Sequence, residues 1–83
     1  MYYVYILASL NHPAKIYIGK TTDLKTRLEQ HNRGDGNYSK RYAPWRIGTY
    51  VVFSDEQLAA SFEHYLKSGS GHAFLKKRFL PKL

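Results

Sequence analysis

The stretch KIYIGKTTDLKTRLEQHNRG, residues 15–34, places a strand, a helix start and a helix stop in close succession. Its alternating branched and aromatic side chains predict a short strand over 15–19. Asp23 is a good helix cap and Gly34 is a typical helix stop, so a helix is predicted between them, ending at about Arg33. A strand that passes directly into a helix makes this stretch the centre of an α+β fold.

The segments on either side supply two more strands. Met1–Leu7 is rich in branched and aromatic residues, and a turn containing Pro13 joins it to the strand above as an antiparallel hairpin. Gly34–Arg46 is a polar, glycine-containing loop with a short helical turn near Tyr38–Tyr42, and Ile47–Phe53 follows as the third strand.

Two further helices are predicted in the last third of the chain. Ser54 opens a capping box for the first of them. Its inward face is predicted to comprise Leu58, Phe62, Tyr65 and Leu66. The second runs to about Phe79, with Pro81 as its stop. The order β-β-α-β-α-α predicts one α+β domain over residues 1–83, with a three-stranded antiparallel or mixed sheet flanked by helices.

The composition restricts the partners and the compartment. The 13 Lys and Arg residues outnumber the 6 Asp and Glu residues, which gives a net charge of +7 and favours nucleic acid as the partner. There are no cysteines, which excludes disulfides and cysteine-bound zinc. Apolar runs fall far short of the ~20 residues that span a membrane, and Met1–Leu10 lacks the basic start of a signal peptide. We therefore expect a soluble, cytoplasmic protein, while the oligomeric state is left open.

Several polar residues fall where a helix or strand is expected to be half-buried. Arg27 and His31 flank the leucine stripe of the first helix, and Glu63 lies at the edge of the apolar face of the next. Singly, each has an ordinary explanation as a snorkelling arginine, a boundary histidine or a salt-bridged carboxylate. Together they supply a base, a cation and a metal-holding carboxylate, the groups that phosphodiester hydrolysis requires. The candidate catalytic set comprises Tyr5, Tyr17, Lys20, Arg27, His31 and Glu63.

These residues resemble the signature of the GIY-YIG nuclease superfamily, in particular its short stand-alone, excinuclease-subunit-C-like members. Tyr17–Gly19 reads Tyr-Ile-Gly, a literal match to the second half of the signature. Tyr3–Tyr5 reads Tyr-Val-Tyr, which retains the tyrosine of the first half and replaces its glycine and isoleucine. Arg27 and Glu63 follow in the order, and on the elements, that the family requires.

The resemblance implies a Mg²⁺- or Mn²⁺-dependent DNA endonuclease acting in repair, recombination or restriction-type processing. Tyr17 would be the general base, or would orient the attacking water, with Lys20 favouring loss of its proton. Tyr5 would hydrogen-bond the water or the scissile phosphate. Arg27 would stabilise the charge that develops on phosphorus. Glu63 would be the metal ligand.

The same resemblance gives His31 a role in contacting phosphate or assisting proton transfer. Basic residues outside this set would hold the backbone of DNA, or of RNA, which is not excluded. The candidates are Lys40, Arg41 and Arg46 in the long loop and Lys76, Lys77 and Arg78 near the C-terminus. Tyr38 and Tyr42 would stack on unpaired bases or pack the loop, and for Trp45 packing is favoured.

Two alternatives remain open. One is a catalytically inactive nucleic-acid-binding module of the same fold. It is favoured by the lack of any Asn after Asn37, where many family members have one late in the domain. In an active enzyme, Ser68, Ser70 or His72 would have to replace it. The other is a protein-interaction domain that docks through its aromatic surface and does not bind DNA.

Overall fold

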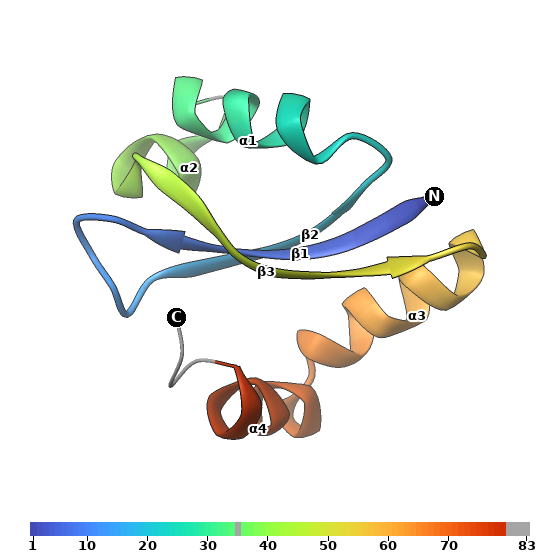
Figure 1. Ribbon diagram of the computed structural model, residues 1–83. Helices are drawn as coiled ribbons and strands as arrows, with labels where there is room; N and C mark the ends of the chain where they lie inside the picture. Colours follow the sequence, from blue (N-terminus) through green and yellow to red (C-terminus); the bar gives the residue numbers. More distant parts are fainter. Residues whose placement is uncertain (35, 80–83) are drawn as a thin grey trace.

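The computed structural model describes residues 1–34 and 36–79, and it consists of one sheet with helices on both faces (Figure 1). The elements in chain order are β1 (Tyr2–Ser9), β2 (Ile16–Thr21), α1 (Leu24–Arg33), α2 (Asn37–Tyr42), β3 (Trp45–Phe53), α3 (Glu56–Leu66) and α4 (Gly69–Arg78). Figure 1 shows α1 and α2 above the sheet and α3 and α4 below it. The predicted α+β class and element order are confirmed, and α2 is the short helical turn expected in the long loop.

The sheet has the order β2-β1-β3, and both strand pairs are antiparallel. The antiparallel form of the prediction is therefore confirmed and the mixed form is excluded. β1 is the central strand, and Tyr5 at its middle is paired with Gly19 on β2 and with Tyr50 on β3. β2 is an edge strand, so side chains and ligands can reach it from both faces of the sheet.

Alternation along β1 builds a separate core on each face of the sheet. Val4 and Ile6 lie on the face covered by α3 and α4, where they pack with Ala59, Leu66 and Leu75. Tyr5 and Leu7 lie on the face covered by α1 and α2, where they pack with Trp45. Trp45 is 3% exposed, which confirms its predicted packing role. Within the described residues, no helix combines the length and the apolar character that crossing a membrane requires.

The ends of α1 form as their residues predict. The Asp23 carboxylate accepts a hydrogen bond from the Thr26 backbone N–H at 3.1 Å. Gly34 closes the helix in the left-handed conformation at φ 78°, which glycine adopts without strain. The last turn is then fixed to β3, because the Asn32 side chain bonds both the backbone N–H and the carbonyl of Trp45.

The structure corrects three details of the predicted C-terminal half. β3 begins at Trp45 rather than at Ile47, because the Asn32 contact and pairing with Ser9 extend it. Asp55, not Ser54, caps α3 through the Gln57 N–H.

The third correction concerns the inward face of α3, which differs from the predicted one. Leu58 is 57% exposed and Tyr65 is 41% exposed, whereas Ala59 and Leu66 are fully buried. Helical spacing from Ala59 passes through Phe62 to Leu66, so Leu58 falls on the outer side. The predicted stop at Pro81 lies outside the described residues.

Candidate active site

Tyr5 lies at the centre of the sheet with its hydroxyl beneath Gly19. It is 2% exposed, and a Cβ at Gly19 would overlap its hydroxyl and lie 2.5 Å from its Cζ. Glycine at this position therefore gives the Tyr5 ring room to pass under β2, the close approach that a glycine in a strand allows. Tyr5 in turn carries its hydroxyl to the region where α1 meets the sheet.

A chain of hydrogen bonds runs from Arg27 through the protein interior to α2. Arg27 Nε donates to the Tyr5 hydroxyl at 3.2 Å, and that hydroxyl lies 3.1 Å from His31 Nε2. His31 Nδ1 lies 2.7 Å from the Ser39 hydroxyl. In either neutral tautomer one imidazole nitrogen donates and the other accepts, so His31 satisfies both hydroxyls. The chain joins α1, β1 and α2 and fixes the Arg27 guanidinium from behind.

Burial and charge set the protonation of the first two groups in this chain. Burial is the main cause that raises the pKa of Tyr5 above its ordinary value of 10.0. The hydrogen bond and the charge of Arg27 lower this pKa, whereas the charges of Tyr17 and Glu63 raise it further. The pKa of Arg27 is raised in turn, chiefly by its bond to Tyr5. At neutral pH Tyr5 is a neutral phenol and Arg27 is a cation.

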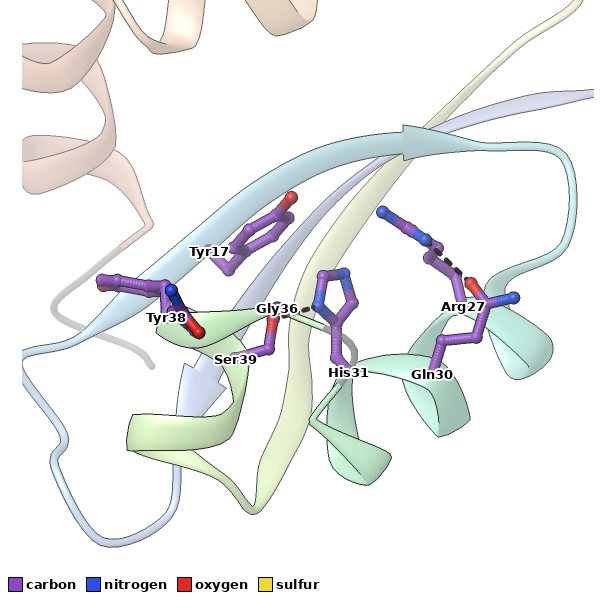
Figure 2. Close-up of a pocket in the computed structure, with 8 residues that line it drawn as sticks. Tyr17, Arg27, Gln30, His31, Gly36, Tyr38 and Ser39 are labelled. Atoms are coloured by element: carbon purple, nitrogen blue, oxygen red, sulfur yellow. Dashed lines mark hydrogen bonds between the residues drawn. The ribbon is translucent and has the colours of Figure 1, made fainter.

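Tyr17 and Arg27 line one hollow of about 290 Å³ between β2, α1 and α2 (Figure 2). The Tyr17 ring lies 4.3 Å from the His31 ring and 6.4 Å from the Tyr5 ring. Figure 2 shows Tyr17 on one side of the hollow, Arg27 on the other and His31 between them. The remaining lining residues are Gln30, Gly36, Asn37, Tyr38 and Ser39. The hollow thus offers a phenol hydroxyl and a guanidinium, which both suit a phosphate group.

Glu63 approaches this region from α3. It is half-buried, its charge contributes to the raised pKa of Tyr5, and its carboxylate lies 3.2 Å from the Lys67 ammonium. Lys67 is exposed and only one helical turn away, so the pair is easily exchanged for another cation. Among residues 1–34 and 36–79, no group of three or more His, Cys, Asp or Glu side chains is placed to hold a metal. Mg²⁺ often binds through one carboxylate together with waters and phosphate oxygens, so Glu63 fits a site of that kind.

Lys20 lies apart from this cluster. Its β1 partner Val4 belongs to the core under α3, so Lys20 is on the α3 face of β2. Its ammonium lies 3.6 Å from the Glu56 carboxylate. The structure therefore brings the two tyrosines, Arg27 and His31 together and directs Lys20 to α3.

The candidate DNA-backbone residues lie on different faces of the domain. Lys40 and Arg41 are exposed on α2, beside the hollow. Lys76 and Lys77 are exposed on α4, across the sheet, where Arg78 ends the helix. Arg46 is half-buried near the start of β3.

Three residues in or next to the candidate site were not predicted from the sequence. Ser39 is 5% exposed and completes the hydrogen-bond chain at His31. Gln30 accepts from the Arg27 Nη1 at 2.8 Å, one turn away on α1. Asn32 holds α1 to β3. The spacing of Gln30 and Arg27, three residues apart on one helix, is the single signal in the sequence that points to such a contact.

The sheet and its two helical layers define a small α+β domain, with Tyr5, Tyr17 and Arg27 gathered beside the edge strand β2. The model of the GIY-YIG catalytic domain matches residues 1–77, and the chain belongs to this family.

Curated relatives fall into two groups. A UPF0213 protein of Haloquadratum walsbyi is 34% identical over 81% of this chain and 74% of its own length, and one of Streptococcus pyogenes serotype M3 is 38% identical over 78% and 70%. The structure-specific endonuclease subunit SLX1 of Candida dubliniensis is 40% identical over 80% of this chain. The match spans only 26% of that subunit, so the chain corresponds to about a quarter of it.

Proposed function

We propose that this chain is a DNA endonuclease that hydrolyses phosphodiester bonds with the help of a divalent metal. Membership of the GIY-YIG catalytic domain family supports the proposal, as does its similarity to a subunit named as a structure-specific endonuclease. The observation that carries it is the buried chain from Ser39 through His31 and Tyr5 to Arg27, which fixes a guanidinium opposite the Tyr17 hydroxyl.

Tyr17 is the residue that would handle the attacking water. A water oxygen attacks phosphorus while the bond from phosphorus to the leaving sugar oxygen breaks, so one proton must leave the water. The Tyr17 oxygen, at the hollow and beside His31, would accept or orient that proton. Tyr5 is unsuited to this task, because burial raises its pKa and its hydroxyl is already engaged by Arg27 and His31.

Arg27 would stabilise the negative charge that develops on the phosphate oxygens. Its Nε is held by Tyr5 and its Nη1 by Gln30, so the guanidinium is oriented before substrate arrives. Tyr5 and His31 then act as positioning residues. This differs from the direct substrate contacts that the family resemblance implied for them.

Glu63 would hold Mg²⁺ or Mn²⁺, which when bound supplies charge stabilisation to the leaving oxygen. Lys67 would give up its ion pair with Glu63 when the metal and the phosphate arrive. We place this activity in DNA repair, recombination or restriction-type processing, in the cytoplasm. RNA as a substrate is a variant of the same chemistry.

The decisive experiment compares cleavage of plasmid, single-stranded and branched DNA in Mg²⁺ and in EDTA. Tyr17→Phe and Arg27→Ala should each reduce kcat by roughly 10²–10⁴-fold. Glu63→Gln should abolish cleavage while DNA binding persists. Glu56→Gln, an exposed carboxylate on the same helix, is the matched control and should cleave as wild type.

Two outcomes would favour the alternatives. Binding without cleavage on every substrate would indicate the inactive nucleic-acid-binding module. The absence of both cleavage and salt-dependent binding would indicate a protein-interaction domain. Unchanged cleavage by Glu63→Gln would refute the assignment of the metal ligand.

A further inference from the structure

Tyr38 is an exposed aromatic residue whose ring is held in place by a hydrogen bond and by stacking. It is 41% exposed, yet its hydroxyl donates to the Ile16 carbonyl at 2.9 Å. Its ring stacks on Trp45 at 5.8 Å with an interplanar angle of 25°. Partial burial of the side chain raises the pKa of Tyr38 above its ordinary value of 10.0, so the ring is uncharged at neutral pH. A rigid, neutral, exposed ring is the kind of platform on which a nucleobase stacks.

Tyr38 also lines two hollows, as does Tyr17. One is the hollow of about 290 Å³ that contains Tyr17 and Arg27. The other, of about 410 Å³, crosses the edge strand β2. Its lining residues are Ile16, Tyr17, Ile18, Tyr38, Leu66, Lys67 and His72. Tyr38 is therefore open to a ligand that leaves the candidate active site in either direction.

Two cations are held beside the next ring in the row. The Tyr42 ring lies 5.0 Å from the Tyr38 ring, and Tyr38 lies 6.3 Å from Tyr17. The Lys15 ammonium lies 5.3 Å and the Arg41 guanidinium 5.5 Å from the centre of the Tyr42 ring. Both of these residues are exposed, and their attraction to the ring restrains them. Along the surface, Tyr17 is followed by the Tyr38 ring, and Tyr38 is followed by Tyr42 with its two cations.

We propose that this row, Tyr17, Tyr38 and Tyr42 with Lys15 and Arg41, binds an unpaired stretch of the substrate strand next to the scissile bond. One base would stack on Tyr38, and a neighbouring phosphate would lie between Lys15 and Arg41. The inference rests on the proposed function and narrows it to DNA with unpaired nucleotides on one side of the cut. Bases in a duplex stack on each other and present no free face to Tyr38, so a fully paired strand would leave the platform unused.

The first test is a binding measurement that needs no cleavage. Fluorescence anisotropy in EDTA would follow a labelled oligothymidine and a duplex of equal length. Tyr38→Leu should weaken binding of the oligothymidine about 5- to 150-fold, the range that corresponds to one stacked base, and should change duplex binding less than about 2-fold.

Charge variants test the cation pair separately. Lys15→Gln with Arg41→Gln should lower the salt dependence of oligothymidine binding, because the phosphate between these two residues is no longer neutralised. Lys25→Gln with Arg33→Gln removes the same charge from exposed positions on α1, outside the proposed row, and is the matched control. Equal effects of the two double variants would overturn the placement of the strand.

The second test locates the stacking position with the unaltered protein, and then repeats the measurement at that position with Tyr38→Leu. An abasic residue is moved one position at a time through the single-stranded flank of a flapped duplex. At one position the abasic residue should weaken binding of the flapped DNA about 5- to 150-fold. With the abasic residue at that position, Tyr38→Leu should not weaken binding further. A flat profile, or additive losses, would refute the stacking on Tyr38.

These measurements distinguish the two proposals. If the protein cleaves DNA but treats flapped and fully paired substrates alike, the inference fails and the endonuclease proposal stands. If nothing is cleaved but the abasic profile has its minimum, the row binds single strands and the endonuclease proposal fails. Binding of an acidic peptide in preference to oligothymidine would overturn the inference in favour of a protein partner.

Discussion

Replacement of Gly19 by alanine is the sharpest perturbation that the fold offers, because a single methyl group would fall on the central residue of the site. The new Cβ would overlap the Tyr5 hydroxyl and lie 2.5 Å from Cζ and 2.9 Å from Cε1 of the same ring. Tyr5 is 2% exposed and packs against both the Tyr17 and the His31 rings, so it cannot swing aside. The strands cannot separate easily either, since Tyr5 and Gly19 are paired at the centre of the ladder.

The loss can be estimated from two contributions. Overpacking of a filled core destabilises by about 1–3 kcal/mol. If Tyr5 is displaced, its hydrogen bond with the charged Arg27 is lost as well, and a bond of that kind contributes about 1.5–3 kcal/mol. A sum of roughly 2.5–6 kcal/mol is comparable to the whole ~3–5 kcal/mol that a domain of this size has available. Gly19→Ala should therefore be partly unfolded at 25 °C.

The assay is urea unfolding followed by the fluorescence of Trp45, beside cleavage of a flapped DNA substrate. With a slope of about 1 kcal/mol per M urea, the midpoint should fall by at least 2 M. Gly69→Ala is the matched control, because a Cβ there meets nothing within 4 Å. Gly71→Ala would collide with the Tyr65 carbonyl on the other face of the sheet. It therefore destabilises the fold through α3 and α4, away from Tyr5, Tyr17 and Arg27.

The comparison of Gly19→Ala with Gly71→Ala separates a loss of stability from a loss of catalysis. At a urea concentration and temperature where both retain the same folded fraction, Gly71→Ala should keep its kcat and Gly19→Ala should lose most of it. Wild-type stability of Gly19→Ala would show that Tyr5 is not confined. Equal kcat in the two variants would show that the position of Tyr5 does not matter for chemistry.

Three further outcomes are expected. Because burial raises the pKa of Tyr5 in the folded state, the proton is bound more tightly there than in the unfolded chain, so stability is full below about pH 10 and falls as the pH rises through the raised value; urea unfolding at pH 7 to 11 should show a smaller alkaline loss in Tyr5→Phe than in wild type. Asn32→Ala leaves the backbone N–H and carbonyl of Trp45 without their side-chain partner, and calorimetry should record a destabilisation of roughly 1–3 kcal/mol with no change in metal dependence. Lys67→Gln removes the cation that competes for Glu63, so a Mg²⁺ titration of cleavage should reach half-saturation at a lower concentration than in wild type, and a higher one would contradict the proposed exchange.

Local patterns in the sequence were sufficient to predict most of the fold. Alternation in Met1–Leu7 separates the two faces of β1, and the structure places its residues on those faces. Asp23 and Gly34 mark the ends of α1 because each satisfies a backbone requirement that few other residues meet. The same logic failed at α3, where Ser54 and Asp55 are both competent caps and only the chain's path from β3 selects the second.

The sequence indicated which residues would form the candidate site, but it did not indicate all the contacts that they make. Periodicity put Arg27 and His31 on one side of α1, and their meeting with Tyr5 follows from that placement. The hydroxyl of Ser39 lies eight residues beyond His31, across a turn whose geometry no local rule specifies. Lys20 has the right charge and lies next to Gly19 in the chain, yet strand alternation turns it to the opposite face.

The position of β2 at the edge of the sheet explains how the proposed site could draw on both helical layers. Tyr17 and Arg27 belong to the layer of α1 and α2, whereas Glu63 comes from α3 on the other face. A central strand would separate these groups by the thickness of the sheet. At an edge strand, with only the hydrogen atom of Gly19 above the Tyr5 hydroxyl, the two layers meet around the backbone of β2. The same edge lets the hollow beside Tyr38 continue across β2, so a strand that leaves the reacting groups has an open path over the stacking ring.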